Sequence, residues 1–316
     1  MAFPGPWRFR RDFPGVGFVR LLIFGFLFGH GVTPVAAWEG PPFLWRMEKG
    51  EAEAYLFGTI HLGDPRLRIL PPAVNAAFER SQVIYTEIPF DPPSLSEAHR
   101  ATQAPSGEEL RGRLSGDLLL EVEEALAAID PSLEIVAFAD RRMWAFAVEL
   151  ITLEARLRHP FLTALDHQLH QRALWEGREV RALETVEEQL AVFRGMTPAD
   201  EEDMLRDTLA HLRNARESGV DATDVLISLY LLGDPGALAV QLELWLGEPA
   251  TEGADFRDAL LTRRDVVLAE RILAHLAEEP DRVHFFALGV AHLVLERGIL
   301  SQLKAAGWRV TRVGPE

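Results

Sequence analysis

Cysteine is absent from this chain of 316 residues. Its absence excludes structural disulfides, thiolate zinc sites and a cysteine nucleophile. Four widespread signatures are missing as well: the G-x-S-x-G elbow, the P-loop, the H-E-x-x-H zinc helix and the Rossmann glycine fingerprint. The sequence therefore gives no motif evidence for any of the enzyme classes that these four signatures mark.

Positive charge is scarce, because 32 lysines and arginines face 48 aspartates and glutamates, which gives a net charge of −16. Residues 1–37 hold four arginines and one aspartate, a net charge of +3, so the remainder carries −16 − 3 = −19. A surface this acidic favours solubility and disfavours nucleic acid and anionic membranes as partners.

The first 37 residues have the pattern of a signal peptide. Four arginines precede the apolar run LLIFGFLF at 21–28, and Val35 and Ala37 take the small-residue positions before a cleavage point. We expect an exported protein, periplasmic or extracellular. The alternative is an N-terminal segment that is kept as a membrane anchor, which would then be the chain's only membrane contact.

Residues 38–316 are predicted to form one α/β domain, with α+β as the alternative. Strand–helix–strand patterns at both ends predict a central sheet that draws strands from both termini, flanked by helices. A helical insertion is expected at about 198–257, and DPPSLSE at 91–97 is expected to be a turn or loop. The predicted strands are 43–48, 52–57, 82–88, 178–184, 282–289 and 308–313.

Two segments share the pattern apolar, Gly, x, x, His, Leu: FGTIHL at 57–62 and LGVAHL at 288–293. Gly58 and Gly289 end predicted strands, and glycine permits positive φ or the close approach of another group. Ligands bind beyond the carboxyl ends of strands in open α/β sheets. If both strands lie in the middle of the sheet, His61 and His292 face each other and suit a divalent metal.

Carboxylates are available for the same site. Alternation in QVIYTEI puts Glu87 on the face of Val83 and Tyr85, where a buried glutamate needs a partner. Glu184 ends the strand REVRALE, and Asp166 lies at the head of a helix. The alternatives are a rim position for Glu87, a first-turn charge for Glu184 and a helix cap for Asp166.

These residues resemble the TraB/GumN family, which includes the Tiki metalloproteases. The likeness covers residues 42–313 in four blocks: LWRMEKGEAEAYLFGTIHLGDPRLRILPPAVNAAFERSQVIYTEI, LDHQLHQRALWEGREVRALETVEEQLAVF, LLTRRDVVLAERI and FFALGVAHLVLERGILSQLKAAGWRVTRV. The third block departs from the family, where Arg-Asn is usual and this chain has Arg264-Asp265. Ala164 stands where a glycine is usual.

The resemblance implies a divalent-metal-dependent hydrolase of the peptidase type. Carried over, its metal ligands are His61, His292 and Glu87, and Glu184 and Arg264 fall on its other polar positions. The family is grouped with erythromycin-esterase-like proteins and haem- or iron-binding ChaN-like proteins, so fold alone does not fix the reaction.

The leading hypothesis is metal-assisted hydrolysis of a peptide or a small ester or amide in the cell envelope, with Mn, Co or Zn. Glu87 and Glu184 share the roles of metal ligand and general base, and Arg264 steadies an oxyanion or a substrate carboxylate. The rivals are binding of a peptide signal, metal or haem without turnover, a metal-independent esterase with a histidine base, and a degenerate member whose histidines are structural.

Overall fold

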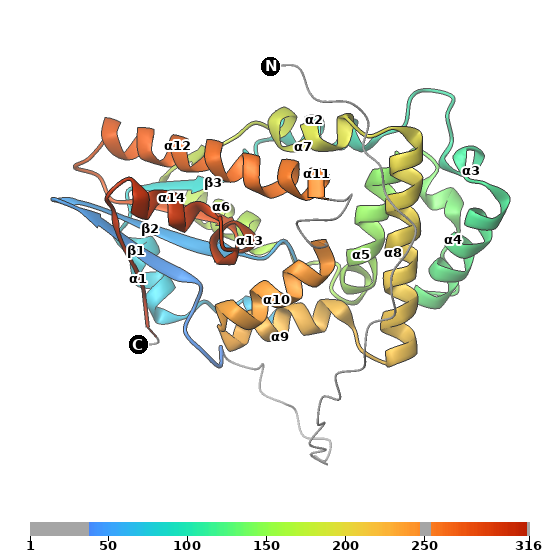
Figure 1. Ribbon diagram of the computed structural model, residues 1–316, viewed down its shortest axis with the longest axis horizontal. Coiled ribbons are helices and arrows are strands. Elements are labelled where there is room, and N and C mark those ends of the chain that lie inside the picture. The colour runs from blue at the N-terminus through green and yellow to red at the C-terminus, as the bar shows by residue number, and fades with distance from the viewer. Residues whose placement is uncertain (1–37, 247–253, 315–316) are drawn as a thin grey trace, which may run out of the picture.

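The computed structural model describes residues 38–246 and 254–314, so the predicted leader at 1–37 lies outside the described residues. Six strands form one mixed sheet in the order β4-β3-β5-β2-β1-β6 (Figure 1). The α/β prediction is confirmed. The strands are β1 Leu44–Lys49, β2 Ala52–Thr59, β3 Val83–Thr86, β4 Glu179–Ala182, β5 His284–Gly289 and β6 Arg309–Arg312.

The sheet combines a parallel centre with an antiparallel edge. β2, β5, β3 and β4 run parallel, whereas β1 pairs antiparallel with β2 on one side and β6 on the other. β1 and β2, both expected as strands, form a hairpin in which Lys49 pairs with Ala52. Every residue of β3 and β5 is buried, as expected for strands covered on both faces.

Helices cover both faces of the sheet. In Figure 1, α12 runs along one side of the sheet and α1 lies on the other. α9 and α10 pack against the sheet core through Leu226, Tyr230 and Leu238. These sheet-associated helices are α1 Pro72–Arg80, α6 Leu165–Trp175, α7 Val186–Arg194, α9 Ala222–Leu232, α10 Pro235–Leu246, α11 Ala254–Arg257, α12 Arg263–Glu278, α13 Ala291–Val294 and α14 Ile299–Ala305.

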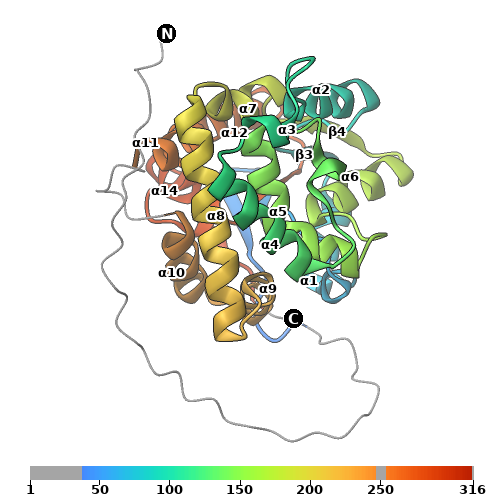
Figure 2. The same ribbon diagram turned by 90° about the vertical axis from the view of Figure 1, so that its right-hand side faces the viewer.

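A separate helical layer has its own hydrophobic core, built around Phe138, Phe146 and Leu205. It stands beside the sheet at the right of Figure 1 and faces the viewer in Figure 2. Its helices are α3 Leu110–Arg113, α4 Gly116–Ile129, α5 Met143–Arg158 and α8 Pro198–Ser218. The segment expected as one insertion, 198–257, is therefore shared between two cores, since α8 joins this layer and α9 and α10 join the sheet.

One local prediction is wrong. The segment DPPSLSE at 91–97 was expected to be a turn or loop, but it forms the cap and the first part of a helix, α2 Pro92–Thr102. Asp91 caps this helix by accepting a hydrogen bond of 3.1 Å from the backbone N–H of Ser94, and two prolines occupy its first turn, where they are tolerated. None of the helices within 38–246 and 254–314 has the length and hydropathy that crossing a membrane requires.

Candidate metal centre

The two G-x-x-H segments lie side by side. β2 and β5 are parallel neighbours, with Gly58 opposite Leu288 and Thr59 opposite Gly289. Beyond the strands, the backbone N–H of Val290 donates to the carbonyl of Thr59 at 2.8 Å and holds the two loops together. Parallel strands end at the same edge, so the sheet brings together two histidines that are 231 positions apart in the sequence (292 − 61).

Both histidines face one oxygen of Glu87, which directly follows β3, the other neighbour of β5. Nε2 of His61 lies 3.9 Å from Oε1 of Glu87, and Nε2 of His292 lies 3.8 Å from the same oxygen. The backbone N–H of Gly289 also donates to this oxygen. The glutamate is buried and has the partners that its position demands.

The two glycines differ in what surrounds them. A Cβ on Gly289 would lie 3.0 Å from Oε1 of Glu87 and 3.1 Å from Nε2 of His61, so a side chain there would push into the site. A Cβ on Gly58 would instead meet Val290 and Phe43, at 2.9 and 3.1 Å. Neither glycine has positive φ. At both positions neighbouring side chains come so close to the backbone that they leave little room for a Cβ. Only Gly289 lies against the site.

A carboxylate holds the second nitrogen of each ring. Nδ1 of His61 lies 3.1 Å from Oδ2 of Asp166, in the first turn of α6. Nδ1 of His292 lies 2.5 Å from Oδ1 of Asp265, in the first turn of α12. With Nδ1 donating, Nε2 is left as an acceptor directed at Glu87, the arrangement typical of metal-binding histidines.

Sequence reasoning had proposed Asp166 but treated Asp265 only as a departure from the family pattern. Asp265 is 3% exposed and is the sole carboxylate bonded to His292 Nδ1 among the described residues. The available signal was an aspartate directly after an arginine, in line with the apolar face that Leu268 and Ile272 continue. A five-residue π-helical turn, Asp258–Thr262, immediately precedes α12, and such turns recur at functional sites.

Arg264 and Glu184 form a layer behind Glu87. Arg264 donates to Oε2 of Glu87 at 3.0 Å, to both carboxylate oxygens of Glu184, and to the carbonyl of Leu260 at 3.0 Å. Neither histidine forms an ion pair with Glu184 within the described chain. The structure thus places Glu184 beside Arg264, behind the point where the histidines meet.

Gln189 is a member of the site that sequence reasoning missed. Its side-chain amide donates to Oε2 of Glu87 at 2.9 Å and to Oε1 of Glu184 at 3.2 Å. A capping box between Thr185 and Glu188 starts α7 at this point, so Gln189 is turned back toward the carboxylates. Its place five residues after the strand-ending Glu184 was a signal in the sequence.

The charges in the site shift its pKa values strongly. Burial alone would raise the pKa of Glu87, but His292, His61 and Arg264 outweigh it and lower the value to about 2. Loss of hydration would lower the pKa of His61, but Asp166 and Glu87 raise it to about 9. Burial raises the pKa of Asp265 in spite of its contact with His292. Glu87 is therefore a carboxylate at neutral pH.

Comparison with known proteins identifies the family of the chain. The sequence profile of the TraB/PrgY/gumN family matches residues 43–312, which span the whole sheet and all the residues of the site. The chain belongs to this family. No solved structure matches the chain.

Curated family members that resemble the chain are named metalloproteases. Metalloprotease TIKI2 of Danio rerio is 25% identical over 90% of this chain and 63% of its own length. Metalloprotease TIKI1 of Danio rerio is 24% identical over 85% of this chain and 62% of its own length. The human TIKI1 is also 24% identical, over 85% and 61%. The chain spans less than two thirds of the length of these family members.

A divalent metal, which the names of these metalloproteases imply, fits the site in donor type and charge. Within the described residues no group of three or more His, Asp or Glu side chains is gathered tightly enough to define a metal site. However, ligand atoms bind zinc at about 2.0–2.2 Å, so donors 3.8 and 3.9 Å apart lie within reach of one ion.

The charge balance supports the same conclusion. Four buried carboxylates (Glu87, Asp166, Glu184 and Asp265) face one largely buried guanidinium, that of Arg264, which leaves a net charge of −3 with the imidazoles in the neutral form that binds a metal. Without a metal, the raised pKa of His61 means that a proton on this ring offsets one of these charges at neutral pH. Uncompensated buried charge is costly, and a divalent cation beside the two Nε2 atoms would offset most of it.

Proposed function

We propose that this chain is a divalent-metal-dependent hydrolase of the peptidase type. One observation carries the proposal: Nε2 of each histidine lies within 3.9 Å of the same Glu87 oxygen, while a buried aspartate holds each Nδ1. The names of the related metalloproteases support the class of reaction.

His61, His292 and Glu87 would hold the ion. A divalent metal bound there supplies a Lewis acid for a scissile carbonyl and for water. Oε1 of Glu87 lies near both Nε2 atoms, and its Oε2 is taken by Arg264 and Gln189, so its position suits a ligand better than a general base. Asp166 and Asp265 keep the two rings oriented with Nε2 inward.

Arg264 and Glu184 act as positioning residues in this proposal. The guanidinium of Arg264 is already committed to Glu87, Glu184 and a backbone carbonyl, so it holds the carboxylates in place instead of offering free donors to an oxyanion. Glu184 supports Arg264 from behind, and Gln189 connects the two glutamates. These assignments replace the proton-transfer and oxyanion roles expected from the sequence.

The substrate we propose is a peptide, and the alternative substrates are small esters and amides. We also propose export, on the basis of the leader pattern and an acidic remainder of the chain. N-terminal sequencing of the protein recovered from a periplasmic or secreted fraction tests export. A protein found only in the cytoplasm with its leader intact would contradict it.

Metal content tests the function directly. The purified protein is incubated with Mn²⁺, Co²⁺ or Zn²⁺, desalted and analysed for bound metal by mass spectrometry, and then assayed for cleavage of a peptide library. We expect near-stoichiometric metal in the wild type and its loss in His61→Ala and His292→Ala. His99→Ala, at an exposed histidine of α2, is the matched control. Absence of metal under all three conditions would overturn the proposal.

A further inference from the structure

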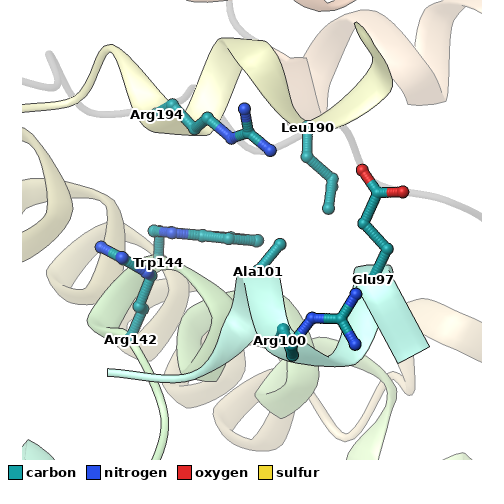
Figure 3. Close-up of a pocket in the computed structure, with 7 residues that line it drawn as sticks. All are labelled: Glu97, Arg100, Ala101, Arg142, Trp144, Leu190 and Arg194. Carbon is teal, nitrogen blue, oxygen red and sulfur yellow. The ribbon is translucent and has the colours of Figure 1, made fainter. Parts of the chain in front are cut away.

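A pocket of about 430 Å³ lies between α2, the start of α5 and α7, outside the candidate metal centre. In Figure 3, Leu190 and Arg194 extend from α7 on one side, Arg100 and Ala101 extend from α2 on the other, and Trp144 reaches between them. The residues that line it are Glu97, Arg100, Ala101, Arg142, Trp144, Leu190 and Arg194.

The pocket is positively charged in a strongly acidic protein. Its three arginines face one glutamate, Glu97, which leaves a local net charge of +2 within a chain of net charge −16. Among these arginines, only Arg194 forms an ion pair, with exposed Glu187 at 2.8 Å. A surface pair of this kind contributes little energy, so Arg194 remains available to a ligand.

Arg100 and Arg142 are unusual among the arginines of this chain. Most other arginines of the described residues are held by carboxylates, as Arg181, Arg206 and Arg271 are. Within the described residues, the guanidinium groups of Arg100 and Arg142 form no hydrogen bond or ion pair. Two unpaired guanidinium groups at one pocket provide planar, two-pronged donors that match a carboxylate.

The pocket has a rigid apolar wall beside these charges. The indole of Trp144 is 5% exposed and stacks on Phe193 of α7, with ring centroids 4.3 Å apart and planes 15° apart. The backbone N–H of Trp144 donates to the buried Glu201 at 3.3 Å, which fixes the start of α5. Leu190 and Ala101 complete the apolar surface. A ligand that fits would carry an apolar group next to its negative charge.

Helix α7 connects the pocket to the metal centre. Gln189 touches Glu87 and Glu184, and the next residue, Leu190, lines the pocket. Arg194 follows five residues after Gln189, about 7.5 Å along the helix axis. About two extended residues of a peptide span such a distance.

We propose that this pocket is a substrate subsite that binds a carboxylate of the peptide, with the neighbouring apolar side chain against Trp144 and Leu190. The identity of the ligand as substrate rests on the proposed hydrolase function. The chemistry of the pocket, an organic carboxylate next to an apolar group, does not require turnover.

Binding of a blocked dipeptide tests the subsite. N-acetyl-leucyl-phenylalanine and its C-terminal amide are titrated into the full chain by calorimetry at about 50 mM salt, where screening is moderate. We expect the acid to bind about tenfold or more tightly than the amide, because hydrogen bonds between charged groups are the stronger ones. The double variant Arg100→Gln/Arg142→Gln should lose this preference, with an unchanged melting temperature.

Two further variants make the result specific. Arg213→Gln/Arg309→Gln removes two positive charges from exposed ion pairs elsewhere and should keep the preference. His61→Ala should keep it too, since that side chain belongs to the metal centre. Equal binding of acid and amide, or a preference that survives in Arg100→Gln/Arg142→Gln, would overturn the subsite. Loss of the preference in His61→Ala would place the carboxylate at the metal centre and would also overturn it.

The outcome is independent of the metal test. If the protein binds no metal but keeps a carboxylate preference that depends on Arg100 and Arg142, the hydrolase proposal fails and the binding pocket stands. If metal binds and the preference is absent, the reverse holds.

Discussion

The two G-x-x-H halves share a motif and a sheet edge but differ in their surroundings. The side chain of His292 is 4% exposed and bonded to the buried Asp265, whereas that of His61 is 55% exposed beside Asp166. Gly289 makes room for the site, whereas Gly58 makes room for the core. A repeated motif thus supplies one buried, fixed histidine and one histidine at the solvent-facing side of the site.

The glycines give the largest expected difference between the halves. In Gly289→Ala, the new methyl group would displace Glu87 or His61, and we expect peptide hydrolysis to fall about 100-fold with little loss of stability. In Gly58→Ala, overpacking against Val290 and Phe43 should cost about 1–3 kcal/mol of stability, with activity per folded molecule retained. Activity assays and denaturant unfolding of both variants separate the two outcomes. Equal activity in the two would erase the distinction.

The aspartates should differ by a smaller factor. In Asp265→Asn the buried ring of His292 loses its charged partner, and we expect metal affinity to fall about 10–100-fold. In Asp166→Asn, water can reach the half-exposed ring of His61, so we expect a smaller loss. Competition with a chelator measures both affinities, and Asp281→Asn, at an exposed site, is the control. A greater loss in Asp166→Asn would reverse the ranking of the halves.

The smallest effect concerns the helix that carries Asp265. Arg271, also on α12, binds Glu188 of α7 and lowers the pKa of that carboxyl from 4.5 to about 2. Because the folded-state pKa is depressed, the pair stabilises the fold above pH 4.5, and this contribution is lost as the pH falls toward 2. Arg271→Gln should cost under about 1 kcal/mol at pH 7, since both groups are partly exposed.

Unfolding of Arg271→Gln at a series of pH values checks this prediction, with Arg309→Gln on the far edge strand as the control for lost positive charge. We expect the acid dependence between pH 4.5 and 2 to become shallower in Arg271→Gln. An unchanged slope would mean that packing alone holds α12 against the buried half of the site.

Local patterns predicted much of this architecture. The six strands, including those before both G-x-x-H segments, follow from residue types within a few positions of one another. Glu87 could be proposed because a carboxylate at the end of a buried strand requires partners. The closeness of His61 and His292 required only that their parallel strands be neighbours in the sheet.

The remaining features depend on contacts that no local pattern encodes. Asp265 reaches His292 across 27 positions, and Gln189 reaches Glu87 across 102. The commitment of Arg264 to two carboxylates became visible only when α12 was placed over the sheet. The second core likewise packs α8 against α4 and α5, which come earlier in the chain. The composition of 198–257 does not show this packing, and it suggested a single helical insertion.

The pairing of β1 with β6 has a consequence for protein engineering. Val313 donates its backbone N–H to the carbonyl of Leu44 at 2.9 Å, and Arg312 bonds to the carbonyl of Pro41 at 2.8 Å. The two ends of the folded domain are therefore adjacent. A circular permutant would link residue 313 to residue 38 and open at the exposed turn near Gly219. It would cut no strand, so the order of the six strands within the sheet would stay the same. Its new ends would lie in the connection between α8, which belongs to the helical layer, and α9, which belongs to the sheet core, and not in a segment that carries either histidine.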